Sequence, residues 1–284
     1  MNEEVLSKLK SVQWSWPMVL VSVLSFLLIY RHYGGYYYRS TMAKVLLFCV
    51  SVYGFIIACI LTPLRCTHLI NYSVAKVMRA SSRFWTGLEV DCEGLELLDQ
   101  IKGPAIYVCN HQSSLDVMLI GVAYRKNTSI VAKKELKSYP FLGWFMTMSN
   151  AIFLDRKNRD SAVKEAKQAA ADIHKKGINV WVFPEGTRGH ESQVTLLPFK
   201  KGPFYMAVQA RVPIVPVVLA NYYNLYSAKE KRFNPGTVKC RILPPISTKD
   251  VLEESSEVQK LADSCREQML NALKEISPQK KADK

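Results

Sequence analysis

The feature that most constrains the fold of this chain is an apolar run over residues 45–64. At a rise of about 1.5 Å per residue, a helix over this run can cross a hydrocarbon core of about 30 Å. A second apolar run, over residues 17–30, reaches that length only if the interfacial tryptophans Trp14 and Trp16 belong to it. We therefore expect a two-helix membrane anchor within residues 1–70, with hydrophobic segments at about 14–30 and 45–64.

A cleaved signal peptide is an alternative explanation for the first apolar run. Arg31, His32 and Tyr33 follow that run, however, where a small-x-small cleavage site would be expected. A pair of helices that spans the bilayer and a pair that dips into one leaflet both place the amino terminus and the remaining chain on the same side.

The charge of the chain indicates which partners it has and where it lies. Its net charge of +14 implies anionic partners, and the apolar runs favour a phospholipid membrane and phosphorylated substrates. The sequence contains no signature of a nucleic-acid-binding module, so we expect no nucleic-acid partner. Basic residues flank the pair of runs more often than they lie between them, which favours a cytosolic catalytic domain. Those outside are Lys8, Lys10, Arg65, Lys76, Arg79 and Arg83, and those between are Arg31, Arg39 and Lys44.

The seven cysteines are scattered along the chain. No pair has C-x-x-C spacing, and none forms a cluster with histidines that would predict a metal site. Reduced, structural thiols in a cytosol-facing protein are the simplest interpretation.

From about residue 85 the hydrophobic pattern alternates between strand-like and helical segments. This alternation predicts an α/β catalytic domain over residues 71–276, with a mixed, largely parallel sheet flanked by helices. Residues 277–284 form a basic tail that we expect to be disordered. The expected helices cover residues 161–176 and 251–276, and the expected strands cover residues 105–109, 130–132, 152–154, 179–183 and 214–219.

A polar stretch from Asn110 to Asp116 directly follows the expected strand 105–109. His111 and Asp116 would lie about 140° apart on a continuous helix, so they meet only if His111 precedes the helix and Asp116 opens it. Ser113 and Asp116 have the spacing of a capping box, which fits that arrangement. Asp116 then caps the helix or accepts the ring N–H of His111, which would make His111 a general base. A purely structural strand-to-helix turn explains the stretch equally well.

A second polar stretch, Glu185 to Arg188, follows the expected strand 179–183. Strand ends are where α/β domains place ligand sites. Gly186 allows close approach of the backbone to a ligand, and Thr187 and Arg188 offer a hydroxyl and a planar fork of donors suited to phosphate. Taken alone, the stretch is more simply a polar surface turn with one solvated arginine.

Together the two stretches resemble motifs of the glycerolipid acyltransferases, and of the 1-acyl-sn-glycerol-3-phosphate (lysophosphatidic acid) acyltransferases in particular. The N-H-x4-D motif of that family matches Asn110 to Asp116, and its E-G-T-R motif matches Glu185 to Arg188. A third family block resembles residues 150–156 and a fourth resembles residues 212–217, in the family's order. The resemblance covers about residues 85–248 and implies the glycerolipid acyltransferase fold.

Two further residues are carried over from this resemblance. Asn150 stands where the third block commonly has glycine, so only Arg156 is taken from that block. Lys134 lies in a stretch, residues 132–136, that resembles a family segment near the substrate phosphate. Charge runs of this kind are usually solvated.

The resemblance implies an enzyme that transfers an acyl group from acyl-CoA to the sn-2 hydroxyl of lysophosphatidic acid, giving phosphatidic acid. His111 would act as the general base, oriented by Asp116, and Arg188 would bind the acceptor phosphate. Backbone N–H groups near Gly186, or at the start of the helix after His111, would stabilise the oxyanion. No metal and no permanently bound cofactor are implied, since acyl-CoA is a co-substrate. The substrate-binding residues would be Glu185, Gly186, Thr187, Arg188, Lys134 and Arg156.

The family also implies a location in the endoplasmic reticulum membrane, whereas nothing in the sequence fixes an oligomeric state. Two alternatives for the function stay open. The acceptor could be glycerol 3-phosphate or another lysophospholipid, or the chain could be a non-catalytic membrane protein that binds lipid or acyl-CoA. The presence of both His111 and Asp116 favours the enzyme.

Overall fold

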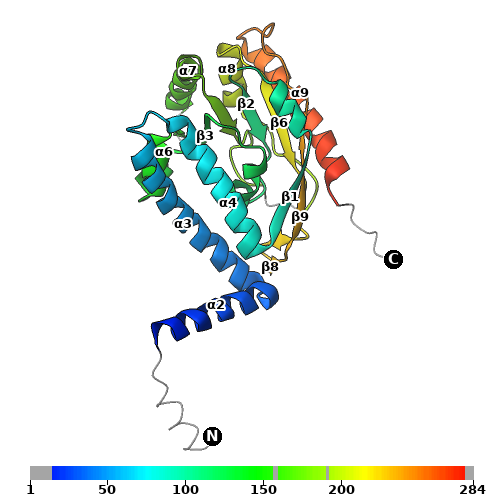
Figure 1. The fold of residues 1–284 in the computed structure, drawn as a ribbon. Coiled ribbons are helices and arrows are strands. Elements are labelled where there is room, and N and C mark those ends of the chain that lie inside the picture. Colours follow the sequence, from blue (N-terminus) through cyan, green and yellow to red (C-terminus); the bar gives the residue numbers. More distant parts are fainter. Residues whose placement is uncertain (1–14, 156–158, 190–191, 279–284) are drawn as a thin grey trace, which may run out of the picture.

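The computed structural model describes residues 15–155, 159–189 and 192–278. At its centre is a seven-stranded sheet in the order β1-β9-β6-β2-β5-β3-β4 (Figure 1). Every neighbouring pair is parallel except β6 and β9, which confirms the prediction of a mixed, largely parallel sheet flanked by helices. The strands are β1 (Leu88–Glu93), β2 (Ile106–Cys109), β3 (Thr128–Lys133), β4 (Ile152–Leu154), β5 (Asn179–Val182), β6 (Ile214–Leu219) and β9 (Gly236–Ile242).

Helices cover both faces of the sheet because its crossovers run in opposite directions. From β2 the chain passes through α5 (Asp116–Leu119) towards β3, whereas from β5 it passes through α8 (Gly202–Gln209) back to β6. Right-handed crossovers that run in opposite directions place their helices on opposite faces. Accordingly α4 (Ile70–Thr86) packs against α5. On the other face α8 contacts both α7 (Arg159–Lys176) and α9 (Ser255–Ile276).

Short elements connect these layers. A two-stranded hairpin, formed by β7 and β8, follows β6, and the small helix α6 precedes β4. Their bounds are β7 (Tyr226–Ser227), β8 (Arg232–Phe233) and α6 (Leu142–Met148), with 3₁₀ turns η1 (Thr67–Leu69), η2 (Leu95–Gln100), η3 (Ile120–Val122) and η4 (Lys134–Ser138).

The central strands form the core of the molecule. Every residue of β2 and β6 is buried, as their continuous apolar sequences predict for strands covered on both faces. Trp181 of β5 and Ile214 of β6 are completely inaccessible to solvent. The loops at the carboxyl ends of β2 and β5 therefore begin from a rigid, close-packed base.

The amino-terminal helices are α2 (Trp16–Tyr33) and α3 (Tyr36–Leu61). The second begins at Tyr36 rather than at residue 45, because no glycine or proline interrupts the chain after Gly35 until the helix is well established. By length and composition, α3 is apolar enough to cross a membrane, with a mean hydropathy of 2.4, whereas the apolar part of α2, Trp16–Tyr30, is shorter.

Helix α3 is also part of the folded body. It packs against α4 and α6, and the Arg39 guanidinium near its start donates to the carbonyls of Thr86 at 3.1 Å and Phe233 at 3.3 Å. By contrast, α2 projects from the body and exposes its apolar side chains, with Trp16 88% exposed (Figure 1). An apolar helix exposed in this way needs an apolar environment, which a bilayer supplies.

The carboxyl-terminal boundary differs slightly from the expectation. Ser277, which we assigned to a disordered tail, is buried, and its hydroxyl accepts the backbone N–H of Asn221 at 2.9 Å. Residues 279–284, the rest of the expected tail, lie outside the described residues.

Candidate active site

The two polar stretches meet because the strands before them are neighbours. β2 pairs in parallel with β5, with Val108 opposite Val182, so the loops that follow leave the same edge of the sheet. Asn110 fixes the start of the first loop, because its side chain exchanges two hydrogen bonds with the backbone of Leu219 on β6, at 2.9 and 2.8 Å. The first loop therefore starts from a position held by the two strands that flank β2.

His111 and Asp116 form a hydrogen-bonded pair, with 2.7 Å between Nδ1 and Oδ2. As expected, His111 lies in the turn and Asp116 is the first residue of α5. The His111 side chain is 18% exposed, whereas that of Asp116 is completely buried. The imidazole also stacks on Phe183, with ring centroids 4.2 Å apart. The ring is thus held on two sides, and Nε2 has no hydrogen-bond partner in the described part of the chain.

Asp116 has both of the roles considered from the sequence. Its Oδ2 accepts the backbone N–H groups of Gln112 at 2.7 Å and Ser113 at 3.0 Å, which closes the turn before α5. The Ser113 hydroxyl accepts the N–H of Leu115 at 3.0 Å, in a variant of the capping box. With His111 as a further donor, Asp116 orients the imidazole and closes the turn before the helix at the same time.

Tyr222, which the sequence did not indicate, completes the surroundings of Asp116. Its buried hydroxyl donates to Oδ1 of Asp116 and lies 2.8 Å from the Ser113 hydroxyl. Burial, and then the negative charge of Asp116, raise the pKa of Tyr222 well above its ordinary value. Tyr222 therefore stays protonated and remains a donor to the carboxylate. In the sequence, the only indication of this role is that Tyr222 follows the strand β6, which lies beside β2 in the sheet.

Glu185 contacts the protein backbone rather than the solvent. One carboxylate oxygen accepts the N–H of His111 at 2.7 Å, and the other accepts the N–H of Leu197 at 2.9 Å. Burial raises the pKa of Glu185, and these two N–H donors oppose that rise. The residue expected to bind substrate thus holds the backbone of His111 in place.

The rest of the second stretch faces outward. Gly186 has a φ of 70°, in the left-handed region that favours glycine, and a Cβ there would meet only the flexible side chain of Lys200 at 3.4 Å. The backbone conformation explains why a glycine occupies this position better than the close approach of a ligand does. Thr187 and Arg188 are exposed. Burial raises the pKa of Tyr226, and the positive charge of Arg188 opposes that rise.

A cavity of about 410 Å³ adjoins the His111–Asp116 pair. Its walls come from the turn after His111, from Gly189 beside Arg188, and from the β7–β8 hairpin. The residues that line it include Gln112, Ser113, Gly189, Tyr222, Tyr226 and Lys229. A ligand in this cavity would contact the two residues that follow His111 and also Tyr222, which donates to Asp116.

The backbone donors expected to stabilise an oxyanion are already engaged. The N–H of Gly186 donates to the carbonyl of Phe183 at 3.2 Å, and those of Gln112 and Ser113 donate to Asp116. In this conformation these three groups hold the loops rather than a ligand.

The remaining predicted residues lie farther along the sheet. Lys134 follows β3, two strands from β2, and its ammonium lies 3.4 Å from the Asp155 carboxylate. At about 4.8 Å per strand, this places Lys134 about 10 Å or more from the base. Arg156 lies outside the described residues. Asn150 has a φ of 61°, which explains why glycine or asparagine suits this position.

No group of three or more His, Cys, Asp or Glu side chains is placed to hold a metal ion within residues 15–155, 159–189 and 192–278. The site therefore consists of the His111 imidazole, its buried carboxylate partner and two loops joined by hydrogen bonds. This arrangement can remove a proton from a hydroxyl group that reaches Nε2 of His111.

Known proteins are similar to this chain in sequence and in fold. A model of the Acyltransferase family matches residues 89–220. Over 241 residues the chain is 39% identical to the 1-acyl-sn-glycerol-3-phosphate acyltransferase of Saccharomyces cerevisiae, covering 85% of this chain and 78% of that protein. Over 223 residues it is 35% identical to the 1-acyl-sn-glycerol-3-phosphate acyltransferase alpha of Mus musculus, covering 78% and 76%.

The fold has a counterpart among solved structures. The crystal structure of the 1-acyl-sn-glycerophosphate (LPA) acyltransferase PlsC from Thermotoga maritima matches with a TM-score of 0.61 and 25% identity, covering 83% of this chain and 97% of that one. Its sequence and its fold show that the chain belongs to the 1-acyl-sn-glycerol-3-phosphate acyltransferase family.

Proposed function

We propose that this protein transfers an acyl group from acyl-CoA to the sn-2 hydroxyl of lysophosphatidic acid, giving phosphatidic acid. The observation that carries the proposal is the His111–Asp116 pair, with 2.7 Å between Nδ1 and Oδ2 and with Nε2 turned to a partly exposed site. The names of the relatives support lysophosphatidic acid as the acceptor.

The chemistry follows from the direction of the hydrogen bonds. Asp116 accepts the proton on Nδ1, so the neutral His111 presents a lone pair at Nε2. Nε2 takes the proton of the acceptor hydroxyl as the oxygen attacks the thioester carbonyl. The tetrahedral intermediate then collapses, the C–S bond breaks, and the CoA thiolate recovers the proton from the imidazolium. The buried charge of Asp116 stabilises the imidazolium during this sequence.

Arg188 is our candidate for the acceptor phosphate. It is exposed and lies on the loop beside His111, and the next residue, Gly189, lines the adjoining cavity. A guanidinium can bind phosphate with two parallel hydrogen bonds. Thr187 lies beside it on the same loop, whereas Lys134 and Arg156 stay predictions for the more distant parts of the substrates.

We also propose that the protein works at the endoplasmic reticulum membrane with its catalytic domain in the cytosol. The exposed apolar surface of α2 and the length of α3 support attachment to a bilayer, and the excess of basic residues outside the helix pair supports the orientation. A domain held at the bilayer can take its lipid acceptor directly from the leaflet.

The test is acyl transfer from labelled oleoyl-CoA to a panel of acceptors in detergent micelles. The panel contains lysophosphatidic acid, glycerol 3-phosphate and lysophosphatidylcholine. We expect the highest kcat/KM with lysophosphatidic acid. A higher value with either of the other acceptors would contradict the proposed acceptor, and no transfer to any of them would contradict the enzyme.

A further inference from the structure

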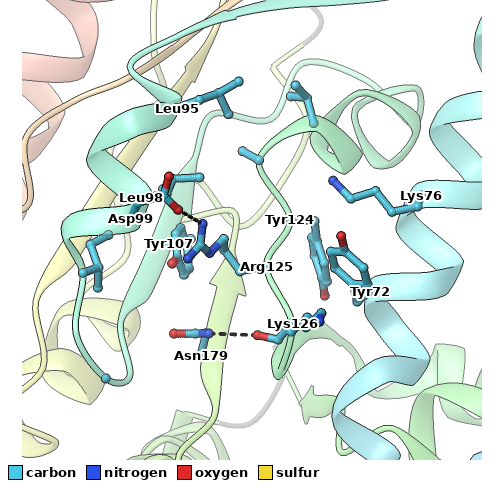
Figure 2. A pocket seen from close by; sticks show the side chains of 14 residues that line it. Tyr72, Lys76, Leu95, Leu98, Asp99, Tyr107, Tyr124, Arg125, Lys126 and Asn179 are labelled. Carbon is cyan, nitrogen blue, oxygen red and sulfur yellow. Dashed lines mark hydrogen bonds and ion pairs between the residues drawn. The ribbon is translucent and has the colours of Figure 1, made fainter.

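A second cavity, of about 510 Å³, lies away from His111 (Figure 2). Its walls come from the first turns of α4, from η2 and the loop after it, and from the segment between η3 and β3. Asn179, the first residue of β5, also lines it, so it opens at the amino edge of the sheet. The catalytic loops leave the carboxyl edge, so the two cavities serve opposite ends of the strands.

The distance between the two sites follows from the strand that connects them. Tyr107 of β2 lines this cavity, and His111 comes four residues later. At about 3.3 Å per residue, the two lie roughly 13 Å apart along the chain. No residue of the turn from Asn110 to Asp116 lines this cavity.

Hydrogen-bond donors converge on this cavity. Tyr107 is 2% exposed and stacks on Trp181, with ring centroids 5.7 Å apart, yet its hydroxyl has no hydrogen-bond partner in the described part of the chain. Burial raises the pKa of Tyr107, and the nearby Arg125 guanidinium opposes that rise. The Tyr107 hydroxyl is therefore a protonated donor, and Arg125 lines the same cavity.

The charges around the cavity are predominantly positive. Lys76, Arg125 and Lys126 line it, with Asp99 as the only carboxylate among the lining residues. Asp99 binds one nitrogen of Arg125 at 2.6 Å, which leaves the other guanidinium donors available. Three cations with one anion form a site that favours a negative ligand.

Lys76 lies over the Tyr72 ring, with its ammonium 5.2 Å from the ring centroid, and has other positive charges near it. Its ammonium donates to the carbonyl of Gly121 at 3.0 Å, which accounts for one of its three protons. Burial, followed by the positive charges of Arg79 and Arg125, lowers the pKa of Lys76. An anion in the cavity would offset that repulsion. Figure 2 shows Lys76 reaching from α4 towards the side on which Arg125 lies.

We propose that this cavity is a second, non-catalytic binding site for a phosphate monoester, held by Lys76, Arg125 and the Tyr107 hydroxyl. A phosphate monoester supplies several acceptor oxygens and a charge close to −2, which match the donors and the net charge of the walls. The cavity lies near the end of α3 that is remote from α2, since the N–H of Asn127 donates to the carbonyl of His68 in η1. A soluble phosphate monoester and a lipid phosphate headgroup share this chemistry, so the experiment distinguishes the two sources.

The test is equilibrium dialysis of radiolabelled inorganic phosphate against the full chain in phosphatidylcholine nanodiscs, at constant ionic strength. All proteins carry Arg188→Gln, which removes the proposed acceptor-phosphate contact and makes the result independent of the proposed function. We expect Lys76→Gln with Arg125→Gln to raise the Kd for phosphate about tenfold or more. Tyr107→Phe should raise it less, because that change removes one neutral donor.

The matched control is Lys260→Gln with Arg241→Gln, which removes the same number of positive charges from side chains that are paired with carboxylates, as Arg125 is. It should leave the Kd within about twofold, since only long-range charge is lost. An unchanged Kd in Lys76→Gln with Arg125→Gln, or no binding in the Arg188→Gln parent, would overturn the site. An equal rise of the Kd in the control would show that only the net charge of the protein matters, and it would also overturn the site.

Two competitors identify the source of the phosphate. Soluble glycerol 3-phosphate should displace the labelled phosphate, and the same concentration of phosphatidic acid in the nanodisc should displace less. Displacement by the lipid alone would still support the site but assign it to a headgroup. Displacement by neither would contradict a phosphate monoester as the ligand.

Discussion

The Glu185 carboxylate accepts the backbone N–H of His111 at 2.7 Å, although the two residues are 74 positions apart in the chain. Its second oxygen accepts the N–H of Leu197, and the N–H of Gly189 donates to the carbonyl of His111 at 2.9 Å. The two sequence motifs therefore form one hydrogen-bonded unit, in which Glu185 positions the backbone of the base.

Replacing Glu185 with Gln should affect turnover more than substrate binding. The amide has one acceptor oxygen, so one of the two backbone N–H donors loses its partner, at a cost of about 1–3 kcal/mol in the free energy of unfolding. We expect kcat to fall about tenfold as His111 shifts, with the KM values within about twofold of wild type. A large rise in the KM for lysophosphatidic acid with an unchanged kcat would show that Glu185 binds substrate directly.

Asp116→Asn should be severely impaired. Asp116 accepts hydrogen bonds from His111, Gln112, Ser113 and Tyr222 and donates none, so an amide brings an N–H group against donors. It also loses the charge that stabilises the imidazolium, so kcat should fall about 10²–10⁴-fold. Asparagine is a good helix cap, so near-normal activity would mean that Asp116 only caps α5.

Tyr222→Phe should lower kcat about tenfold, the effect of removing one hydrogen bond to a buried charge. The ring stays in place, so packing is preserved. Tyr223→Phe is the matched control, because Tyr223 also lines the adjoining cavity but its hydroxyl donates to Glu230 rather than to Asp116. Equal rates in the two variants, measured at saturating substrate, would contradict a role for Tyr222 in holding the carboxylate.

Arg188→Lys should weaken the use of the acceptor. Lysine keeps the charge but loses the planar fork. The transition state with lysophosphatidic acid should therefore lose about 1–3 kcal/mol of stabilisation, and kcat/KM should fall by the corresponding factor. The KM for acyl-CoA should change much less. If the variant instead raises the KM for acyl-CoA and spares lysophosphatidic acid, Arg188 binds the phosphates of CoA.

Much of the sheet was predictable because buried parallel strands have continuous apolar sequences. The segments 105–109 and 214–219 were expected as strands and match β2 and β6 closely. The start of α3 was missed, because residues 36–44 are helical without being strongly apolar. These residues are helical because they contain no glycine or proline and because they pack on the domain. A search for apolar runs detects neither of these causes.

The candidate site was predictable only in part. Local spacing allowed His111 to pair with Asp116 but did not require it, and the family resemblance favoured the pair. Tyr222 reaches Asp116 across 106 positions, and such a contact depends on the order of β2 and β6 in the sheet. The contact from Glu185 to the backbone of His111 also depends on the order of the strands, since it joins the loops after β2 and β5. The spacing of the two motifs in the sequence does not predict it.

The most direct test of the account is the rate of acyl transfer by His111→Ala, measured with lysophosphatidic acid and acyl-CoA at saturation in full-length, membrane-bound protein. The account predicts a loss of about 10²–10⁴-fold in kcat, because no other group removes the hydroxyl proton. The protein should stay folded and membrane-bound, since the change leaves α2 and α3 intact and keeps the hydrogen bonds from the Gln112 and Ser113 N–H groups to Asp116. Retention of more than about half of the wild-type rate, an effect far smaller than the loss of a general base, would contradict the assignment.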